Sequence, residues 1–296
     1  MQNIRFVKDR IASRFMSLVT VGCGLLFCSL VLALYWKARP ILKLIPLDQL
    51  LFSASWHPFK KEFGFLPFLI GTFWVTAVAM LLAVPLCILT AIYLSEYAIK
   101  RVREIVIPLI DLLSGIPSVV YGMWGVLIIV PLIKNRVAPF FHHYSSGYCI
   151  LAGGVVLAIM ISPIIIHVCL EVLKSVSSQV REVSLALGAT KWQTIKHVVL
   201  RKASPGIIAA VALGLSRALG ETMAVLMVAG NVAKIPKSLF DPVYPLPALI
   251  ANNYGEMLSI PMYDSALLLA ALLLLGVVLF FNIVSRLVII RVENRI

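Results

Sequence analysis

The sequence predicts an all-α membrane protein, a bundle of six transmembrane helices. Hydrophobic residues make up 61% of its 296 positions and charged residues only 13%, whereas a soluble domain has about 45–50% and about 25%. A membrane-spanning helix needs about 20 consecutive, mainly apolar residues. Segments of that kind occupy 15–36, 67–95, 105–133, 148–170, 204–232 and 264–286. They lack the period-two alternation of transmembrane β-strands, which favours helices.

Three of the six segments are longer than one crossing needs, and each contains Pro or Gly. The second contains Pro85, and the fifth contains Pro205. Tilt, a kink or a turn at the interface absorbs such extra length. In the third segment we expect Gly115, Pro117 and Ser118 to break the helix. The break either exposes backbone groups to a pathway or serves only as a packing kink.

The basic residues predict the orientation of the bundle. The formal net charge is +13, but the Lys and Arg residues lie mostly between apolar segments. We interpret them as topology signals and lipid-headgroup contacts, not as a nucleic-acid surface. Segments on the side of both termini carry more Lys and Arg than the loops on the opposite side. Because cytoplasmic loops carry this excess, we expect both termini in the cytoplasm.

Two charged residues, Arg217 and Glu221, lie inside the fifth apolar segment. An ionisable side chain at bilayer depth costs about 2.5–3.5 kcal/mol on insertion scales, so it usually faces protein or water and usually has a function. Spacing of four residues places both side chains on one face of a helix, close enough to pair. Arg217 offers a planar fork of donors that suits an anion, with Ser216 and Thr222 as neighbouring hydroxyl donors. The alternative is a structural ion pair between helices.

The inner segment 171–206 predicts two short amphipathic helices. The first covers 177–187 and ends at Gly188, as helices often end at glycine. Thr190 is placed to cap the second helix, with Gln193 as its capping-box partner. A compact helix–turn–helix at the membrane surface suits docking to another protein. The alternative is a simple interfacial connector.

No catalytic or metal site is predicted. The five cysteines, at positions 23, 28, 87, 149 and 169, lie in or beside apolar segments without metal-ligand spacing. The adjacent His142 and His143 have no carboxylate or thiolate close by in the sequence. No nucleophile–base pair is visible either. The sequence therefore favours a transport protein over an enzyme.

The inner loop resembles the cytoplasmic loop shared by permease subunits of ABC importers. That loop begins with Glu, has Gly at its seventh position and ends with an aliphatic pair. Glu182, Gly188, Val198 and Leu200 match this pattern. Arg201 stands where the family has proline, and two alanines after the glutamate are replaced.

Three further stretches resemble the phosphate-specific ABC transporter permeases of the PstC type. They are LLAVPLCILTAIYLSEYA at 81–98, LLSGIPSVVYGMWGV at 112–126 and GLSRALGETMAVLMVAGN at 214–231. The resemblance covers roughly 65–290 and implies a type I importer fold. It divides the chain into a first helix with its outer loop (1–66), the permease transmembrane domain (67–290, with a coupling loop at 177–200) and a cytoplasmic tail (291–296).

The resemblance also implies a function and partners. The chain would form the phosphate path in the bacterial inner membrane with a second, PstA-type permease subunit. A periplasmic phosphate-binding protein would deliver the anion, and a cytoplasmic ATPase dimer would bind ATP and Mg²⁺, so this chain needs no cofactor. The sequence itself contains no G-x-x-x-x-G-K-[ST] phosphate-binding loop.

Site roles follow from the same resemblance. The path residues would be Arg217, Glu221, Thr222 and Ser216. The residues that couple to the ATPase would be Glu182, Gly188, Ala189 and Thr190. The alternatives are an ABC permease for another oxyanion, such as sulfate or molybdate, and a secondary transporter that needs no ATPase.

Overall fold

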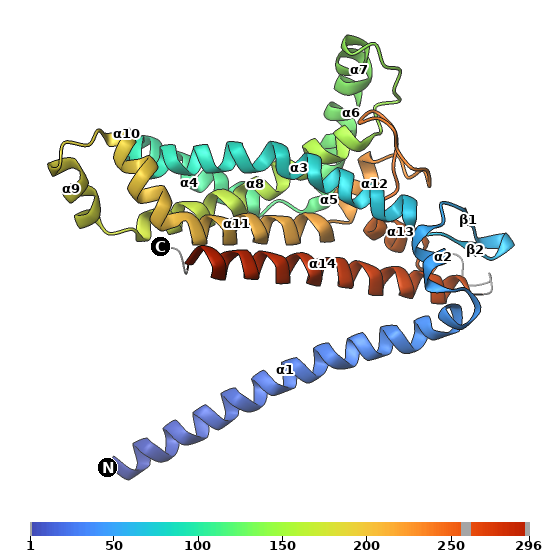
Figure 1. Ribbon diagram of the computed structural model, residues 1–296, viewed down its shortest axis with the longest axis horizontal. Helices are drawn as coiled ribbons and strands as arrows, with labels where there is room; N and C mark the ends of the chain where they lie inside the picture. Colours follow the sequence, from blue (N-terminus) through green and yellow to red (C-terminus); the bar gives the residue numbers. More distant parts are fainter. Residues whose placement is uncertain (1, 256–261, 294–296) are drawn as a thin grey trace.

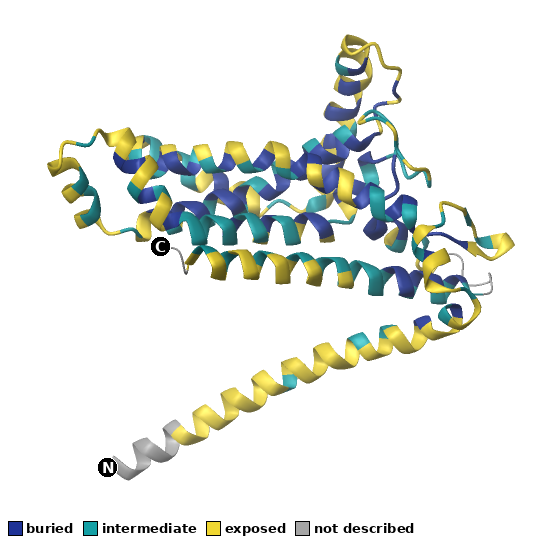
Figure 2. Cartoon of the chain, in the orientation of Figure 1, coloured by how far each residue is buried: buried dark blue, intermediate teal, exposed yellow. Residues whose placement is uncertain are grey.

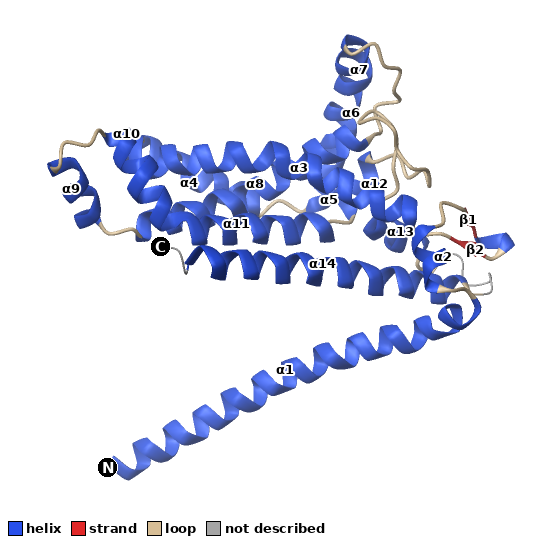
Figure 3. Cartoon of the chain, in the orientation of Figure 1, coloured by secondary structure: helices blue, strands red, loops and turns tan. Residues whose placement is uncertain are grey.

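Helices make up most of the structure, a computed structural model that describes residues 2–255 and 262–293, with side chains from residue 10 (Figures 1 and 3). The helices and strands, in chain order, are α1 (Gln2–Leu44), α2 (Leu47–Phe52), β1 (Trp56–His57), β2 (Glu62–Phe63), α3 (Leu66–Ile92), α4 (Lys100–Ser114), α5 (Ser118–Trp124), α6 (Val130–Leu132), α7 (Ala138–Phe140), α8 (Ile150–Ser175), α9 (Ser178–Ala186), α10 (Lys191–Thr194), α11 (Leu200–Gly220), α12 (Met223–Val228), α13 (Leu246–Asn253) and α14 (Tyr263–Glu293). Of the predicted tail, residues 294–296 lie outside the described part.

Six helical segments within the described residues are long and apolar enough to cross a membrane, which confirms the predicted number. They are Arg10–Leu44, Leu66–Tyr97, Ser118–Phe140, Ile150–Ser175, Lys191–Gly220 and Tyr263–Glu293. Single π-helical turns join several of the shorter helices into these segments, for example Ile195–Val199 between α10 and α11.

The third and fifth spans begin and end elsewhere than predicted. The third was expected over 105–133, but α4 ends at Ser114 and the crossing helix starts only at Ser118. The fifth was expected over 204–232, but its helix runs from Lys191 to Gly220. The second helix of the inner loop is therefore not separate, because it continues into the span. Apolar composition alone does not distinguish a continuous helix from two helices joined by a break.

The centre of the bundle is the packing of α3 against α8. Small residues allow their backbones to approach closely, as is common between membrane helices. A Cβ added at Gly154 would lie 2.4 Å from the Cγ1 atom of Val78, so no larger side chain fits there without rearrangement. Buried residues of both helices, among them Ala79 and Ile161, belong to one core cluster that also includes α11 and α12 residues.

Helix α1 stands apart from this centre. Most of its length is exposed in the isolated chain, and it diverges from α14 in the view of Figure 2. Only its C-terminal end joins the protein core: Ala38 and Ile41 are fully buried in a second cluster with Phe63 and Tyr263. Trp56 of the β1–β2 hairpin packs edge-on against Phe63 in the same cluster.

The two ends of the bundle differ in what they carry. Helices α9 and α10 project at one end, where the C-terminal end of α14 and the N-terminal end of α1 also point (Figure 1). The other end carries α6, α7, α13 and the β1–β2 hairpin. Six crossings place both ends of the chain on one side of the bundle, and that side is the one with the 177–200 loop.

Candidate functional site

The fifth span is interrupted at its end by a short non-helical stretch. Helix α11 ends at Gly220, and the next residue, Glu221, has extended backbone angles (φ −70°, ψ 126°). A new helix, α12, starts at Met223. Such interruptions leave backbone groups outside the helical hydrogen-bond pattern, and at membrane depth they are tolerated where protein or a water-filled cavity surrounds them.

Glu221 caps the helix that follows the interruption. Its Oε1 atom accepts a hydrogen bond of 3.2 Å from the backbone N–H of Ala224. A carboxylate at a helix N-terminus is stabilised by the helix dipole. The half-buried Glu221 side chain also lines a small cavity with Thr72 and Thr76 of α3 and with Pro245.

The prediction that Arg217 and Glu221 pair across one helical turn is wrong in this conformation. The helix ends at Gly220, between the two residues, so the four-residue spacing no longer places them on one face. Among the described residues, no carboxylate oxygen lies within 4.0 Å of the Arg217 guanidinium. Arg217 is exposed in the isolated chain.

Arg217 is in the last turn of α11, just before the interruption of the fifth span. Its charge acts electrostatically on the hydroxyl of Tyr121, in α5. That hydroxyl donates a 2.7 Å hydrogen bond to the carbonyl oxygen of Leu113, on the other side of the α4–α5 break. Helices α5 and α12 are packed closely, since a Cβ at Gly122 would lie 3.2 Å from the Cα atom of Ala224.

The residues expected to break the third span lie in this break. Gly115 is the C-cap residue directly after α4. Pro117 precedes α5, and Ser118 is the first residue of α5. Proline has no N–H to donate, so it fits the start of a helix better than its interior. Whether these residues line a pathway stays a prediction.

The two hydroxyl groups beside the charged residues already have partners within the chain. The Oγ atom of Ser216 lies 2.6 Å from Oδ1 of Asn282 and 3.0 Å from the carbonyl oxygen of Ala212, so it links α11 to α14. The hydroxyl of Thr222 donates to the carbonyl oxygen of Gly220 at 3.2 Å. For either hydroxyl to bind a solute, it must exchange this partner.

This arrangement favours an anion. A guanidinium within an apolar span costs free energy unless polar groups accept hydrogen bonds from its N–H donors. Its planar fork matches carboxylate and phosphate oxygens, and Arg217 has no such partner among the described residues of this chain. The same residues contain no group of three or more His, Cys, Asp or Glu side chains placed to hold a metal ion.

A second candidate surface is the loop at the α9 end of the bundle. Gly188 follows the end of α9 and has a positive φ of +84°. The N–H of Ala189 donates a hydrogen bond to the carbonyl oxygen of Ser184 at 3.2 Å. Thr190 and Gln193 form the predicted capping box at the start of α10. A residue other than glycine adopts such a positive φ only with strain.

The face of α9 is exposed and partly apolar. Val183 is 60% exposed and Leu187 is 83% exposed, and Glu182 is exposed as well. None of the α9 residues is buried. Exposed apolar residues grouped on a helix outside the six crossing segments are typical of a surface that binds another protein.

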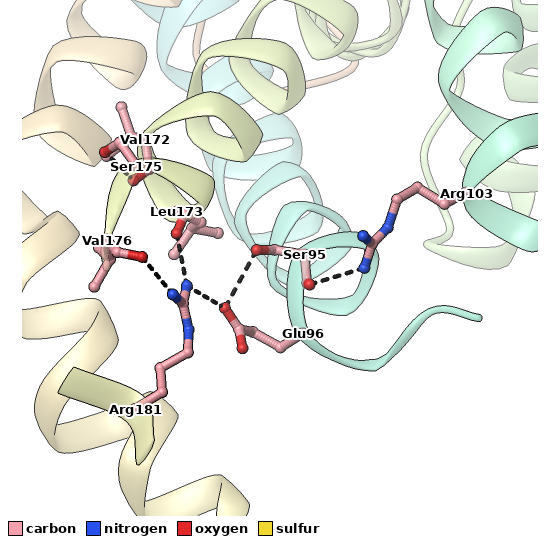
Figure 4. A network of polar contacts seen from close by, with 8 residues as sticks. All are labelled: Ser95, Glu96, Arg103, Val172, Leu173, Ser175, Val176 and Arg181. Atoms are coloured by element: carbon pink, nitrogen blue, oxygen red, sulfur yellow. Dashed lines mark hydrogen bonds and ion pairs between the residues drawn. The ribbon is translucent and has the colours of Figure 1, made fainter. Parts of the chain in front are cut away.

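A mostly buried ionic network at this end was not predicted from the sequence. Arg181, in α9, is 2.8 Å from the carboxylate of Glu96, just beyond α3 (Figure 4). The two residues are 85 positions apart. Each of the two residues lies beside an apolar segment in the sequence, but no local sequence pattern predicts that their side chains meet.

Comparisons with known proteins agree with this architecture. Residues 83–294 match the family described as "binding-protein-dependent transport system inner membrane component". The chain is 35% identical to a phosphate transport system permease protein PstC of Xylella fastidiosa, over 98% of this chain and 94% of that protein. It is 33% identical to a probable phosphate transport system permease protein PstC of Methanocaldococcus jannaschii, over 85% of this chain and 84% of that one.

Solved structures show the same fold. A chain of the MetNI methionine ABC transporter, in inward-facing conformations, aligns with a TM-score of 0.55 at 19% identity, over 75% of this chain and 91% of that one. A chain of a bacterial ABC transporter that imports the acidic polysaccharide alginate aligns with a TM-score of 0.53 at 20% identity, over 88% and 95%. At these identities the likeness concerns the fold alone.

Proposed function

The chain belongs to the family of binding-protein-dependent transport system inner membrane components, and on that premise we propose that it is a permease subunit of an ATP-driven phosphate importer. The observation that carries the proposal is Arg217, a guanidinium in the last turn of α11, before the interruption of the fifth span, with no carboxylate partner among the described residues. Relatives that match nearly the whole chain are named as phosphate permeases.

Arg217 binds the anion as it passes. Its fork of N–H donors makes charge-assisted hydrogen bonds to two phosphate oxygens, and the permanent positive charge offsets the cost of removing the anion from water. Glu221, held at the start of α12 by the Ala224 N–H, places a negative charge near the path. That charge keeps binding weak enough for release. Ser216 and Thr222 add hydroxyl groups when they exchange their present partners.

The loop with α9 couples the bundle to an ATPase. The exposed Glu182, Val183 and Leu187 form the docking surface, and Gly188, Ala189 and Thr190 set the angle between the two arms of the loop. ATP and Mg²⁺ bind to the ATPase dimer, and this chain performs no catalysis. A PstA-type second permease subunit completes the path, and a periplasmic phosphate-binding protein docks at the opposite end.

The proposed docking of a cytoplasmic ATPase at α9 implies an orientation for the bundle. The α9 end faces the cytoplasm, and both termini, which point to the same end (Figure 1), are cytoplasmic. The excess of Lys and Arg on that side agrees with this placement. The protein is a multi-pass component of the bacterial inner membrane.

Competition between anions tests the proposal. Uptake of radiolabelled phosphate by cells that carry the complete transporter is measured with excess unlabelled phosphate, sulfate or molybdate. We expect unlabelled phosphate alone to suppress uptake. Equal suppression by sulfate or molybdate would indicate a permease for another oxyanion. Failure of the chain to copurify with any ATPase would favour an independent secondary transporter.

A further inference from the structure

The end of the second span holds both arms of the α9–α10 loop. A π-helical turn, Tyr93–Tyr97, extends α3. From this turn, Glu96 contacts Arg181 in the arm before Gly188 at 2.8 Å. The ring of Tyr97 lies 4.6 Å from the Nζ atom of Lys191, in the arm after Gly188. Both arms therefore contact the same five-residue segment.

Arg181 is the centre of this contact. Its Nη2 atom donates to the carbonyl oxygen of Leu173 at 2.8 Å and to Oε1 of Glu96 at 2.8 Å, and its Nη1 atom donates to the carbonyl oxygen of Val176 (Figure 4). The last carbonyls of a helix lack partners within that helix, so Arg181 satisfies the end of α8. The side chains are mostly buried, with exposed fractions of 21% for Arg181 and 9% for Glu96.

The network extends to α4. The hydroxyl of Ser95 donates to Oε1 of Glu96 at 3.2 Å. The Nη2 atom of Arg103 donates to the carbonyl oxygen of Ser95 at 2.9 Å. Four segments are thus joined in one network that runs through Ser95, Glu96 and Arg181: α9, the end of α8, the end of α3 and the start of α4.

Helix α3 connects this network to the interruption of the fifth span. It packs along α8, and a close-packed protein interior has low compressibility and transmits strain. Near its other end, Thr72 and Thr76 line the cavity that Glu221 also lines. The hydroxyl oxygen of Thr72 accepts a 2.9 Å hydrogen bond from the N–H of Leu246, the first residue of α13.

We propose that Glu96 is a positioning residue that transmits movement of the docking helix α9 to the second span through Arg181. The inference rests on the proposed function, because it assumes an ATPase that moves α9. When α9 moves, the Arg181–Glu96 ion pair pulls the end of α3. The other end of α3 then shifts the walls of the cavity beside Glu221.

The test measures how accessible the interruption of the fifth span is to a thiol reagent when ATP binds. Its result does not depend on which anion is transported. Cysteine is introduced at position 222 in an otherwise cysteine-free chain, within the complete transporter in proteoliposomes. The rate of thiol labelling is compared with and without a nonhydrolysable ATP analogue. We expect the analogue to change the rate in the wild-type background. In Glu96→Gln, which keeps the shape and loses the charge-assisted hydrogen bond, we expect the response to fall about tenfold.

Glu104→Gln is the matched control. Glu104 lies close by on α4, but its pair with Lys100 is exposed, at 3.8 Å, so this variant should respond like the wild type. A wild-type labelling response in Glu96→Gln would overturn the inference. The inference would also be overturned if Glu96→Gln bound less ATPase but each assembled complex still gave the wild-type response. If Glu96→Gln does not assemble, Arg181→Gln, which removes the same ion pair from the α9 side, is measured with the same expectation.

A second readout separates this inference from the proposed function. The number of ATP molecules hydrolysed per phosphate imported should rise in Glu96→Gln, because α9 still docks but no longer moves α3. Absence of phosphate import by the wild type would count against the proposed function. In that case the labelling response would still measure the role of Glu96.

Discussion

The carboxylate of Glu221 accepts a hydrogen bond from the N–H of Ala224 at 3.2 Å, so it caps the helix after the interruption and leaves Arg217 without an ion-pair partner among the described residues. This relationship changes the interpretation of the two charged residues. They are not a closed pair that an anion must open. The carboxylate of Glu221 is held by the chain, and under the proposed function the guanidinium of Arg217 is available to a solute.

Replacing Arg217 should strongly reduce transport without disrupting the bundle. Arg217→Gln removes the permanent charge and the fork, and each lost charge-assisted hydrogen bond is worth about 1.5–3 kcal/mol. We expect phosphate uptake to fall at least about tenfold, with normal amounts of assembled transporter. Arg217→Lys, which keeps the charge, should retain part of the activity. Normal uptake in Arg217→Gln would rule out the proposed role.

Neutralising Glu221 should separate phosphate affinity from turnover. In Glu221→Gln, the amide oxygen still accepts from the Ala224 N–H, so the start of α12 is preserved. The loss of negative charge should lower the KM for phosphate and slow release, which lowers the maximal rate. Glu221→Ala loses the cap as well as the charge, at a further cost of about 1 kcal/mol, so its difference from Glu221→Gln measures the effect of the cap. Uptake kinetics of Glu221→Gln identical to wild type would contradict the proposed function of the charge.

The number of crossings and the caps of the inner loop were predictable because their signals are local. Apolar length identifies a span, and Thr190 with Gln193 identifies a helix start. The Arg217–Glu221 pairing was wrong because the spacing argument assumed a helix that continues past Gly220. The contact between Glu96 and Arg181 was not predictable, because the packing of α3 against α8 determines it.

Alanine at position 188 should weaken coupling. Gly188 has a φ of +84°, and a Cβ added there would have no other atom within 4 Å, so the penalty comes from the backbone alone. Left-handed backbone costs other residues about 1–2 kcal/mol, a factor of about 5–30 in the population of the docking conformation. ATPase stimulation by the loaded binding protein measures the loss. Gly276→Ala, in α14 and also without a nearby atom, should behave like wild type.

Thiol labelling should show which end of the bundle faces the cytoplasm. Leu187 is 83% exposed at the α9 end, and Tyr144, beyond α7, is 101% exposed at the other. In a cysteine-free background expressed without the ATPase, a membrane-impermeant reagent added to intact spheroplasts should label Tyr144→Cys and spare Leu187→Cys. After permeabilisation, both should react. The opposite pattern would invert the proposed orientation.

Phosphate transport in proteoliposomes tests the central claim most directly. Vesicles are loaded with ATP and prepared with this chain, its partner permease and the ATPase, and radiolabelled phosphate is supplied with its binding protein outside. The account predicts accumulation of phosphate that stops when the ATPase, the ATP or this chain is omitted. Accumulation that continues without the ATPase, or a complete system that never accumulates phosphate, would contradict it.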